Sequence, residues 1–208
     1  MVRPTPRLHL RRIPGVAREL HVSMMRHFAE GNLHPVEKDL CAGLLRSLRA
    51  RLAPRTPGMS MRWTLHRYLA RPRLMSYKVV LLPPPAGDQR DTEVHGLVQA
   101  VVRIHSLQSV RHVKRVRTRE EGGRLGTREM LVDVHGALLP DEEQVADSGV
   151  VPKDAKAAVE YLVIQKSVRK SKEGPWMVWG TTEETSLEKL RADHKKSQQI
   201  KLSGKSSA

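Results

Sequence analysis

The apolar residues of this chain change their spacing at the segment 54–58 (PRTPG). Before this segment they recur every four residues, at Val16, Leu20, Met24 and Phe28 and again at Val36, Leu40, Leu44 and Leu48. A recurrence of four is typical of amphipathic helices, so the sequence predicts one helix over 16–30 and a second that begins at Pro35. Gly31 and Asn32 end the first helix, and 54–58 ends the second.

Beyond residue 58 the pattern is typical of strands. Predicted strands lie at 74–82, 94–117, 130–134, 161–168 and 176–182, with Gly122 and Gly123 as a hairpin signal. In the longest of these, Val98, Ala100, Val102 and Ile104 share one face and Gln99, Arg103 and His105 share the other, as in a half-buried strand. Helices followed by antiparallel strands predict an α+β fold, in which a curved sheet packs against the N-terminal helices.

This α+β domain is expected to span residues 16–184. Residues 1–15 contain four arginines and no acidic residue, which indicates either a basic N-terminal arm or the remnant of a mitochondrial presequence. Residues 185–208 are expected to form a basic C-terminal tail, with a short charged helix from Leu187 and a solvated Lys/Ser segment after it.

Positive charge is concentrated in the first part of the chain. The net charge is +15, and twelve of these charges belong to residues 1–82, which hold sixteen Lys or Arg and four Asp or Glu. The planar fork of arginine matches phosphate oxygens, so a polyanion is the expected partner, and RNA, DNA and an anionic membrane all qualify. A soluble basic protein without a dedicated partner is the alternative. Aromatic residues make up only 3% of the chain, which favours phosphate contact over base stacking.

The candidate phosphate-contacting residues lie on the outer faces of the helices and around the predicted hairpin. They are Arg46, Arg49, Arg51, Arg55, Arg111, Lys114, Arg115, Arg117, Arg119, Arg124 and Arg128, and they are expected to bind RNA or phospholipid. The residues from Arg111 to Arg119 flank the hairpin tip and are expected to project beyond the sheet. The alternative is a charged strand end that prevents aggregation.

Few residue patterns indicate chemistry. Cys41 is the single cysteine, so the chain has no internal disulfide and no thiolate zinc site. The ten histidines, among them His21, His27, His95, His105 and His135, show no spacing typical of metal ligands and are expected to be solvated or hydrogen-bonded. No catalytic residue, metal or cofactor is therefore predicted. Asp133 is the candidate base only in the alternative that the sheet cavity belongs to a small enzyme.

Any membrane association is expected to be peripheral. No apolar run approaches the roughly twenty residues that a spanning helix needs. Trp63 and Trp179 are candidates for the membrane interface, where a ring with a polar edge is favourable. Core packing is the alternative, and it is expected to account for at least one of the three tryptophans.

Several segments together resemble a known family. They are Trp63-Thr64-Leu65 running to Leu69, Pro72 and Leu74-Met75; 102–106 (VRIHS); 151–154 (VPKD) leading to 160–166 (EYLVIQK); and 174–179 (GPWMVW). In order and spacing they resemble the Tim-forty-four-like domain, which the mitochondrial import-motor anchor shares with a protein of the large mitoribosomal subunit. The likeness covers roughly residues 16–184 and is closer to the ribosomal branch, which includes the fungal inner-membrane ribosome receptor.

This resemblance implies a cystatin-like version of the fold, a strongly curved antiparallel sheet wrapped around N-terminal helices. It also implies a protein of the mitochondrial matrix that is peripheral on the inner membrane, near the polypeptide exit of the ribosome. The sequence departs from the family in its short N-terminal segment and in the Arg/Lys-rich hairpin at 111–128.

The function implied is that of a mitochondrial large ribosomal subunit protein or ribosome receptor, not an enzyme. It would bind rRNA and tether the ribosome to the inner-membrane lipid surface for cotranslational insertion. Its partners would be the large subunit, the membrane and the insertion machinery, with no small-molecule substrate. One alternative is an import-motor scaffold, which is expected to need a longer N-terminal region than the roughly fifteen residues before the first helix. A small cystatin-like-fold enzyme is the other.

Overall fold

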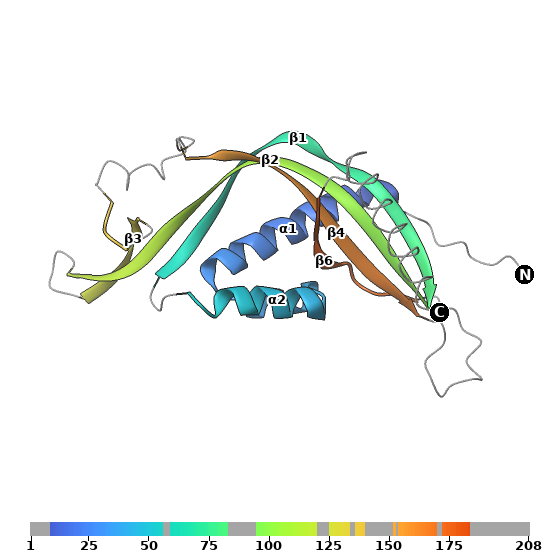
Figure 1. Ribbon diagram of the computed structural model, residues 1–208, viewed down its shortest axis with the longest axis horizontal. Coiled ribbons are helices and arrows are strands. Elements are labelled where there is room, and N and C mark those ends of the chain that lie inside the picture. The colour runs from blue at the N-terminus through green and yellow to red at the C-terminus, as the bar shows by residue number, and fades with distance from the viewer. Residues whose placement is uncertain are drawn as a thin grey trace, which may run out of the picture.

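The protein is an α+β structure in which a six-stranded antiparallel sheet arches over two helices (Figure 1). The computed structural model describes residues 9–55, 59–82, 95–119, 125–133, 136–139, 152, 154–169 and 172–183. The helices are α1 (Ile13–Glu30) and α2 (Ala42–Leu52), with short 3-10 helices at Leu10–Arg12 and His34–Asp39. The strands are β1 (Met59–Leu82), β2 (His95–Arg119), β3 (Leu125–Val132), β4 (Lys156–Arg169), β5 (Lys172–Glu173) and β6 (Met177–Thr182). The predicted N-terminal arm up to residue 8, the Gly122-Gly123 turn, the C-terminal tail and its helix lie outside the described residues.

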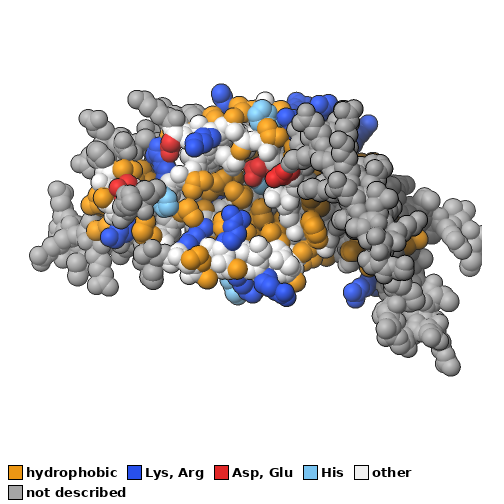
Figure 2. Space-filling model, in the orientation of Figure 1, with side chains coloured by type: hydrophobic (Ala, Val, Ile, Leu, Met, Phe, Trp, Pro, Cys, Tyr) orange, Lys and Arg blue, Asp and Glu red, His pale blue; other side chains and the backbone are white. Residues whose placement is uncertain are grey.

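The sheet order is β1-β2-β4-β5, with β3 paired to β2 and β6 paired to β4. Both helices lie on the concave side of the arch (Figure 1). Figure 2 shows apolar side chains gathered in the middle of this view, with basic side chains around them. The core forms where the apolar stripe of α1 meets alternate residues of β2 and β4. Its most deeply buried side chains include Val102, Ile104, Leu162 and Ile164. This confirms the predicted inner face of the long strand.

The first predicted helix is confirmed, although it begins three residues earlier, at Ile13. Pro14 occupies the first turn, where its missing N–H costs no hydrogen bond. Gly31 ends the helix in the left-handed conformation, at φ +80°, which glycine adopts without a steric penalty.

The prediction of one continuous second helix that begins at Pro35 is wrong. A 3-10 helix covers His34–Asp39, Leu40 is extended, and α2 begins only at Ala42. The helix is interrupted because Leu40 forms a parallel bridge with Val178 and the Cys41 N–H donates to the Val178 carbonyl at 2.9 Å. The four-residue spacing survives the break because both segments face the same core.

Strand β1 is much longer than the predicted 74–82, since it begins at Met59. Four register shifts against β2 interrupt its alternation between Leu65 and Ser76, and Pro72 lies within this part. Among the described residues β1 pairs only with β2, and an edge strand tolerates proline because its outer N–H groups need no partner in the sheet.

Only part of the basic segment 110–119 of β2 projects beyond the sheet, as the pairing with β1 and β3 shows. Residues from Val110 to Lys114 pair with β1, and His112–Lys114 also pair with β3, so this half lies within the sheet and corrects the prediction. From Arg115 to Arg119 the strand pairs, among the described residues, only with β3, and it forms an arm beyond β1 (Figure 1). Strand β3 begins five residues before its predicted start.

A candidate polyanion-binding surface

The convex face of three adjacent, described strand segments is rich in cations and lacks acidic side chains. The adjacent strand segments 67–78, 97–107 and 157–169 contain one carboxylate, that of Glu160. Glu160 is opposite Ile104, which faces the core, and its carboxylate contacts His21 of α1 on the concave side. The convex face of these three segments therefore has no negative charge of its own.

Arginine side chains face each other across β1 and β2 on this convex side. Arg73 lies directly opposite Arg103, which stands between the fully buried Val102 and Ile104 and so points away from the core. Arg67 and Lys78 of β1 are exposed opposite the outward positions Leu107 and Gln99. Like charges directly opposite each other destabilise a sheet unless a counter-charge compensates them. This arrangement favours a bound polyanion.

Sequence reasoning missed the cations of β1, which comprise Arg62, Arg67, Arg71, Arg73 and Lys78. A signal was present, because no Asp or Glu occurs between Asp39 and Asp88. The sequence does not assign this signal to a surface, because register shifts between Leu65 and Ser76 break the alternation that would indicate a strand.

The predicted arginines around α2 have different surroundings. Arg49 forms an ion pair with Glu37, and Arg51 lies over the Phe28 ring at 5.3 Å. Arg55 also lies over this ring, and its Nη1 donates to the carbonyls of Phe28 and Ala29 at 2.9 Å each. Burial, together with the charge of Arg51, lowers the pKa of Arg55. Arg55 therefore caps the C-terminus of α1.

Arg46, by contrast, is exposed on α2 and makes no ion pair within the part of the chain that the structure describes. Of the four predicted arginines in this region, it is the one that remains available to a polyanion without breaking a described contact.

The predicted phosphate-contacting residues around the hairpin also differ in their surroundings. Arg111 donates from Nε and Nη2 to the two carboxylate oxygens of Asp154, at 3.3 and 3.1 Å, and these hydrogen bonds lower the pKa of Asp154. Lys114 is exposed on β2. Arg115, Arg117 and Arg119 lie on β2 and Arg128 on β3, but their side chains, and Arg124 entirely, are outside the described part.

The two candidate interface tryptophans have opposite environments. Trp63 is only 6% exposed, and its Nε1 donates to Gln108 Oε1 at 2.6 Å, so it belongs to the core and not to a membrane interface. Trp179 is 52% exposed at a bulge in the pairing of β6 with β4. Only Trp179 keeps the exposure that the prediction requires.

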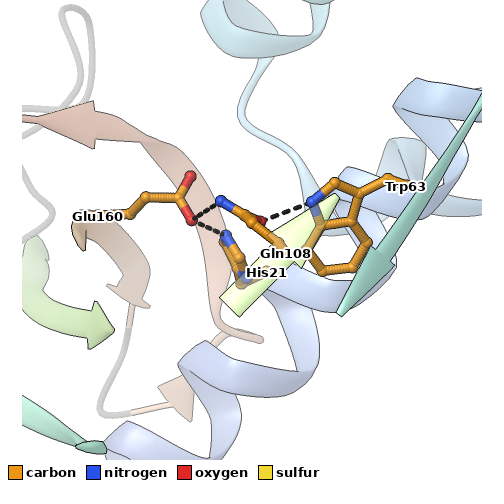
Figure 3. A network of polar contacts seen from close by, with 4 residues as sticks. All are labelled: His21, Trp63, Gln108 and Glu160. Atoms are coloured by element: carbon orange, nitrogen blue, oxygen red, sulfur yellow. Dashed lines mark hydrogen bonds and ion pairs between the residues drawn. The ribbon is translucent and has the colours of Figure 1, made fainter. Parts of the chain in front are cut away.

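A buried polar network ties α1 to three strands (Figure 3). His21, which is 0% exposed, donates from Nε2 to Glu160 Oε2 at 2.9 Å, because a carboxylate can only accept. Gln108 Nε2 donates to the same oxygen at 3.3 Å, and Trp63 packs edge-on against His21 with ring centroids 5.7 Å apart. Burial raises the pKa of Glu160, but the hydrogen bond and charge of His21 and the Gln108 bond outweigh it and lower the pKa.

The burial of His21 indicates that this network stabilises the fold and does not form a catalytic site. The His21 ring is enclosed on all sides, so no substrate reaches it in this conformation. His27 likewise donates from Nδ1 to the Ser23 carbonyl at 2.8 Å. Both histidines agree with the prediction that they are hydrogen-bonded, while His135 and the side chain of His95 lie outside the described residues.

The remaining chemical candidates are engaged in local structure. Asp133 Oδ1 accepts a hydrogen bond from the Ala137 N–H at 2.8 Å and so holds the turn after β3. Gln165 donates to the Cys41 sulfur at 3.1 Å, and burial raises the pKa of the Cys41 thiol. In the described ranges, no three His, Cys, Asp or Glu side chains come together as a metal site, and no helix is long and apolar enough to cross a membrane.

Fold and surface together define an α+β protein with a cationic convex sheet face and a largely buried polar network on its concave side. No protein-family model matches the chain, and no curated protein matches it either.

Proposed function

We propose that this protein is a non-enzymatic adaptor that binds the phosphate backbone of RNA through the convex face of its sheet. Following the sequence resemblance, we propose the rRNA of the mitochondrial large ribosomal subunit as the partner and a cystatin-like form of the α+β fold. The observation that carries the proposal is the Arg73–Arg103 pair, which stands on three strand segments without an outward carboxylate.

The surface chemistry favours backbone contact over sequence reading. Cations held opposite each other repel, and phosphates that neutralise them relieve the repulsion and release condensed counterions. Tyr161 of β4 lies opposite Arg103. It is buried, so its ring is not available for base stacking. RNA recognition by this face would therefore depend on shape and charge.

We further propose that the protein is peripheral on the matrix side of the mitochondrial inner membrane and presents ribosomes to the insertion machinery. Exposed apolar residues at the end of β1, namely Met75, Val79, Leu81 and Leu82, lie near Lys78 and support this. A cation near an anionic membrane contributes about 1 kcal/mol, so apolar contact is needed to add to it for stable attachment. Trp179 offers a second exposed ring.

The test is the salt dependence of binding to isolated mitochondrial large subunits and to a duplex RNA. The double variant Arg73→Gln/Arg103→Gln should weaken both and lower the slope of log affinity against log salt by about 1 to 2, since each lost phosphate contact removes roughly one unit or slightly less. Arg49→Gln is the matched control, because Arg49 is already paired with Glu37.

Sedimentation with large subunits that does not change between low and high salt would refute phosphate contact. An equal loss in the double variant and in Arg49→Gln would refute the assignment to the convex face. Recovery of the import channel alone, after crosslinking in mitochondria, would instead support an import scaffold.

A further inference from the structure

A cavity of about 180 Å³ lies between the start of α1 and the concave side of the sheet. Leu10, Ile13 and Val16 line it from the helix side, and Tyr77, Lys166 and Trp176 line it from the sheet side. It is separate from the convex face and from the His21 network, neither of which contributes a lining residue. For scale, an engineered apolar cavity of about 150 Å³ accommodates one benzene molecule.

The hydroxyl of Tyr77 is the unusual feature of this cavity. Its oxygen is buried, yet it has no hydrogen-bond partner among the described residues. Burial, and then the charge of Glu173, another lining residue, raise the pKa of Tyr77, so the group is a neutral O–H. A buried hydroxyl without a partner is destabilising, and such groups are rare in native proteins. A ligand that accepts from this hydroxyl would remove the cost.

The charges around the cavity favour an anion. Lys166 lies over the Trp176 ring at 4.9 Å and forms an ion pair with Glu173, so these two charges partly offset each other, although the Glu173 charge still acts on Tyr77. Besides His9, the lining residues therefore include two cationic side chains, those of Lys166 and Arg12, and one carboxylate, that of Glu173. The N-terminus of the eighteen-residue helix α1 lies at the same place and adds a partial positive charge.

We propose that this cavity binds a small organic carboxylate whose body is about one aromatic ring in size. The apolar lining residues and Trp176 would contact the ring. The carboxylate would accept a hydrogen bond from the Tyr77 hydroxyl, with Arg12 and the start of α1 supplying the favourable potential. This site does not depend on the proposed RNA function.

The probe is 4-fluorobenzoate, titrated against the full chain and observed by fluorine NMR, with 4-fluorobenzylamine as the cationic counterpart of the same size. A ligand this small is expected to bind with Kd on the order of 1 mM. Tyr77→Phe should weaken 4-fluorobenzoate binding about tenfold, because it removes one hydrogen bond to a charged group. Arg12→Gln should weaken it about twofold to threefold, as expected for a charge at a solvent-exposed rim.

A second measurement separates binding from folding. Because the Tyr77 hydroxyl has no partner in the described part of the chain, the unliganded Tyr77→Phe variant should melt at the same temperature as the wild type or at a higher one. Tyr68→Phe is the matched control, since Tyr68 is a partly buried tyrosine of the same strand that does not line the cavity, and it should leave the affinity unchanged.

The proposal is wrong if 4-fluorobenzylamine binds as tightly as 4-fluorobenzoate, or if neither binds. It is also wrong if Tyr77→Phe and Tyr68→Phe have equal affinity for 4-fluorobenzoate.

Discussion

The polar network of His21, Gln108 and Glu160 predicts a pH-dependent loss of stability for Glu160→Gln. This substitution keeps the size of the side chain and removes its charge. His21 Nε2 and Gln108 Nε2 both donate to the same carboxylate oxygen, at 2.9 and 3.3 Å. An amide oxygen accepts the same hydrogen bonds more weakly, because it carries no full negative charge.

The size of the effect follows from the burial of the pair. A hydrogen bond to a charged group contributes about 1.5 to 3 kcal/mol. His21 is 0% exposed, but the Glu160 side chain is 22% exposed, so partial screening by solvent favours a value of about 2 kcal/mol. For a chain of this length, about 2 kcal/mol corresponds to a decrease in Tm of roughly 4 to 8 °C.

The pH dependence has a definite sign. The folded pKa of Glu160 is lowered from its ordinary value of 4.5, so its contribution is complete above that value and is lost as the pH falls through the folded pKa. Urea unfolding of the wild type and of Glu160→Gln should therefore show the full difference at pH 7. The difference should shrink at pH 3.5 and below, because protonation removes the wild-type charge as well.

Glu37→Gln is the matched control for this experiment. It removes the carboxylate of an exposed pair with Arg49, and such pairs contribute between zero and about 1 kcal/mol. A Glu160→Gln difference that is the same at pH 7 and at low pH would refute the role assigned to the charge. A loss no larger than that of Glu37→Gln at pH 7 would refute the energetic importance of the network.

Two further substitutions test the packing. Leu162→Ala, at a fully buried position of β4, should lower the free energy of unfolding by about 2 to 5 kcal/mol in urea titration, and a loss below about 1 kcal/mol would contradict the proposed core. Arg55→Ala should cost about 1 to 2 kcal/mol, because it removes both hydrogen bonds to the end of α1 and the contact with Phe28. Arg46→Ala is its control and should be nearly neutral, so equal melting temperatures for the two variants would show that Arg55 does not cap the helix.

Local periodicity was sufficient to predict α1, the long strand β2 and its inner face. In these elements the regularly spaced apolar residues face the core, as Val102 and Ile104 show. Strand β1 was underestimated because bulges shift its register and break the alternation on which the prediction depends. The second helix was misjudged for another reason, since a contact with Val178, more than 130 residues away, extends the chain at Leu40.

The same distinction applies to the candidate surface. The sequence by itself determined the surplus of arginine, the lack of acidic residues between Asp39 and Asp88 and the order of helices and strands. Only the tertiary structure decided which cations remain available. It placed Arg55 on a helix end and Arg111 on Asp154, and it set Arg73 against Arg103. The physical reason is that charge is a property of one residue, whereas its neutralisation depends on partners brought together by strand register and helix packing.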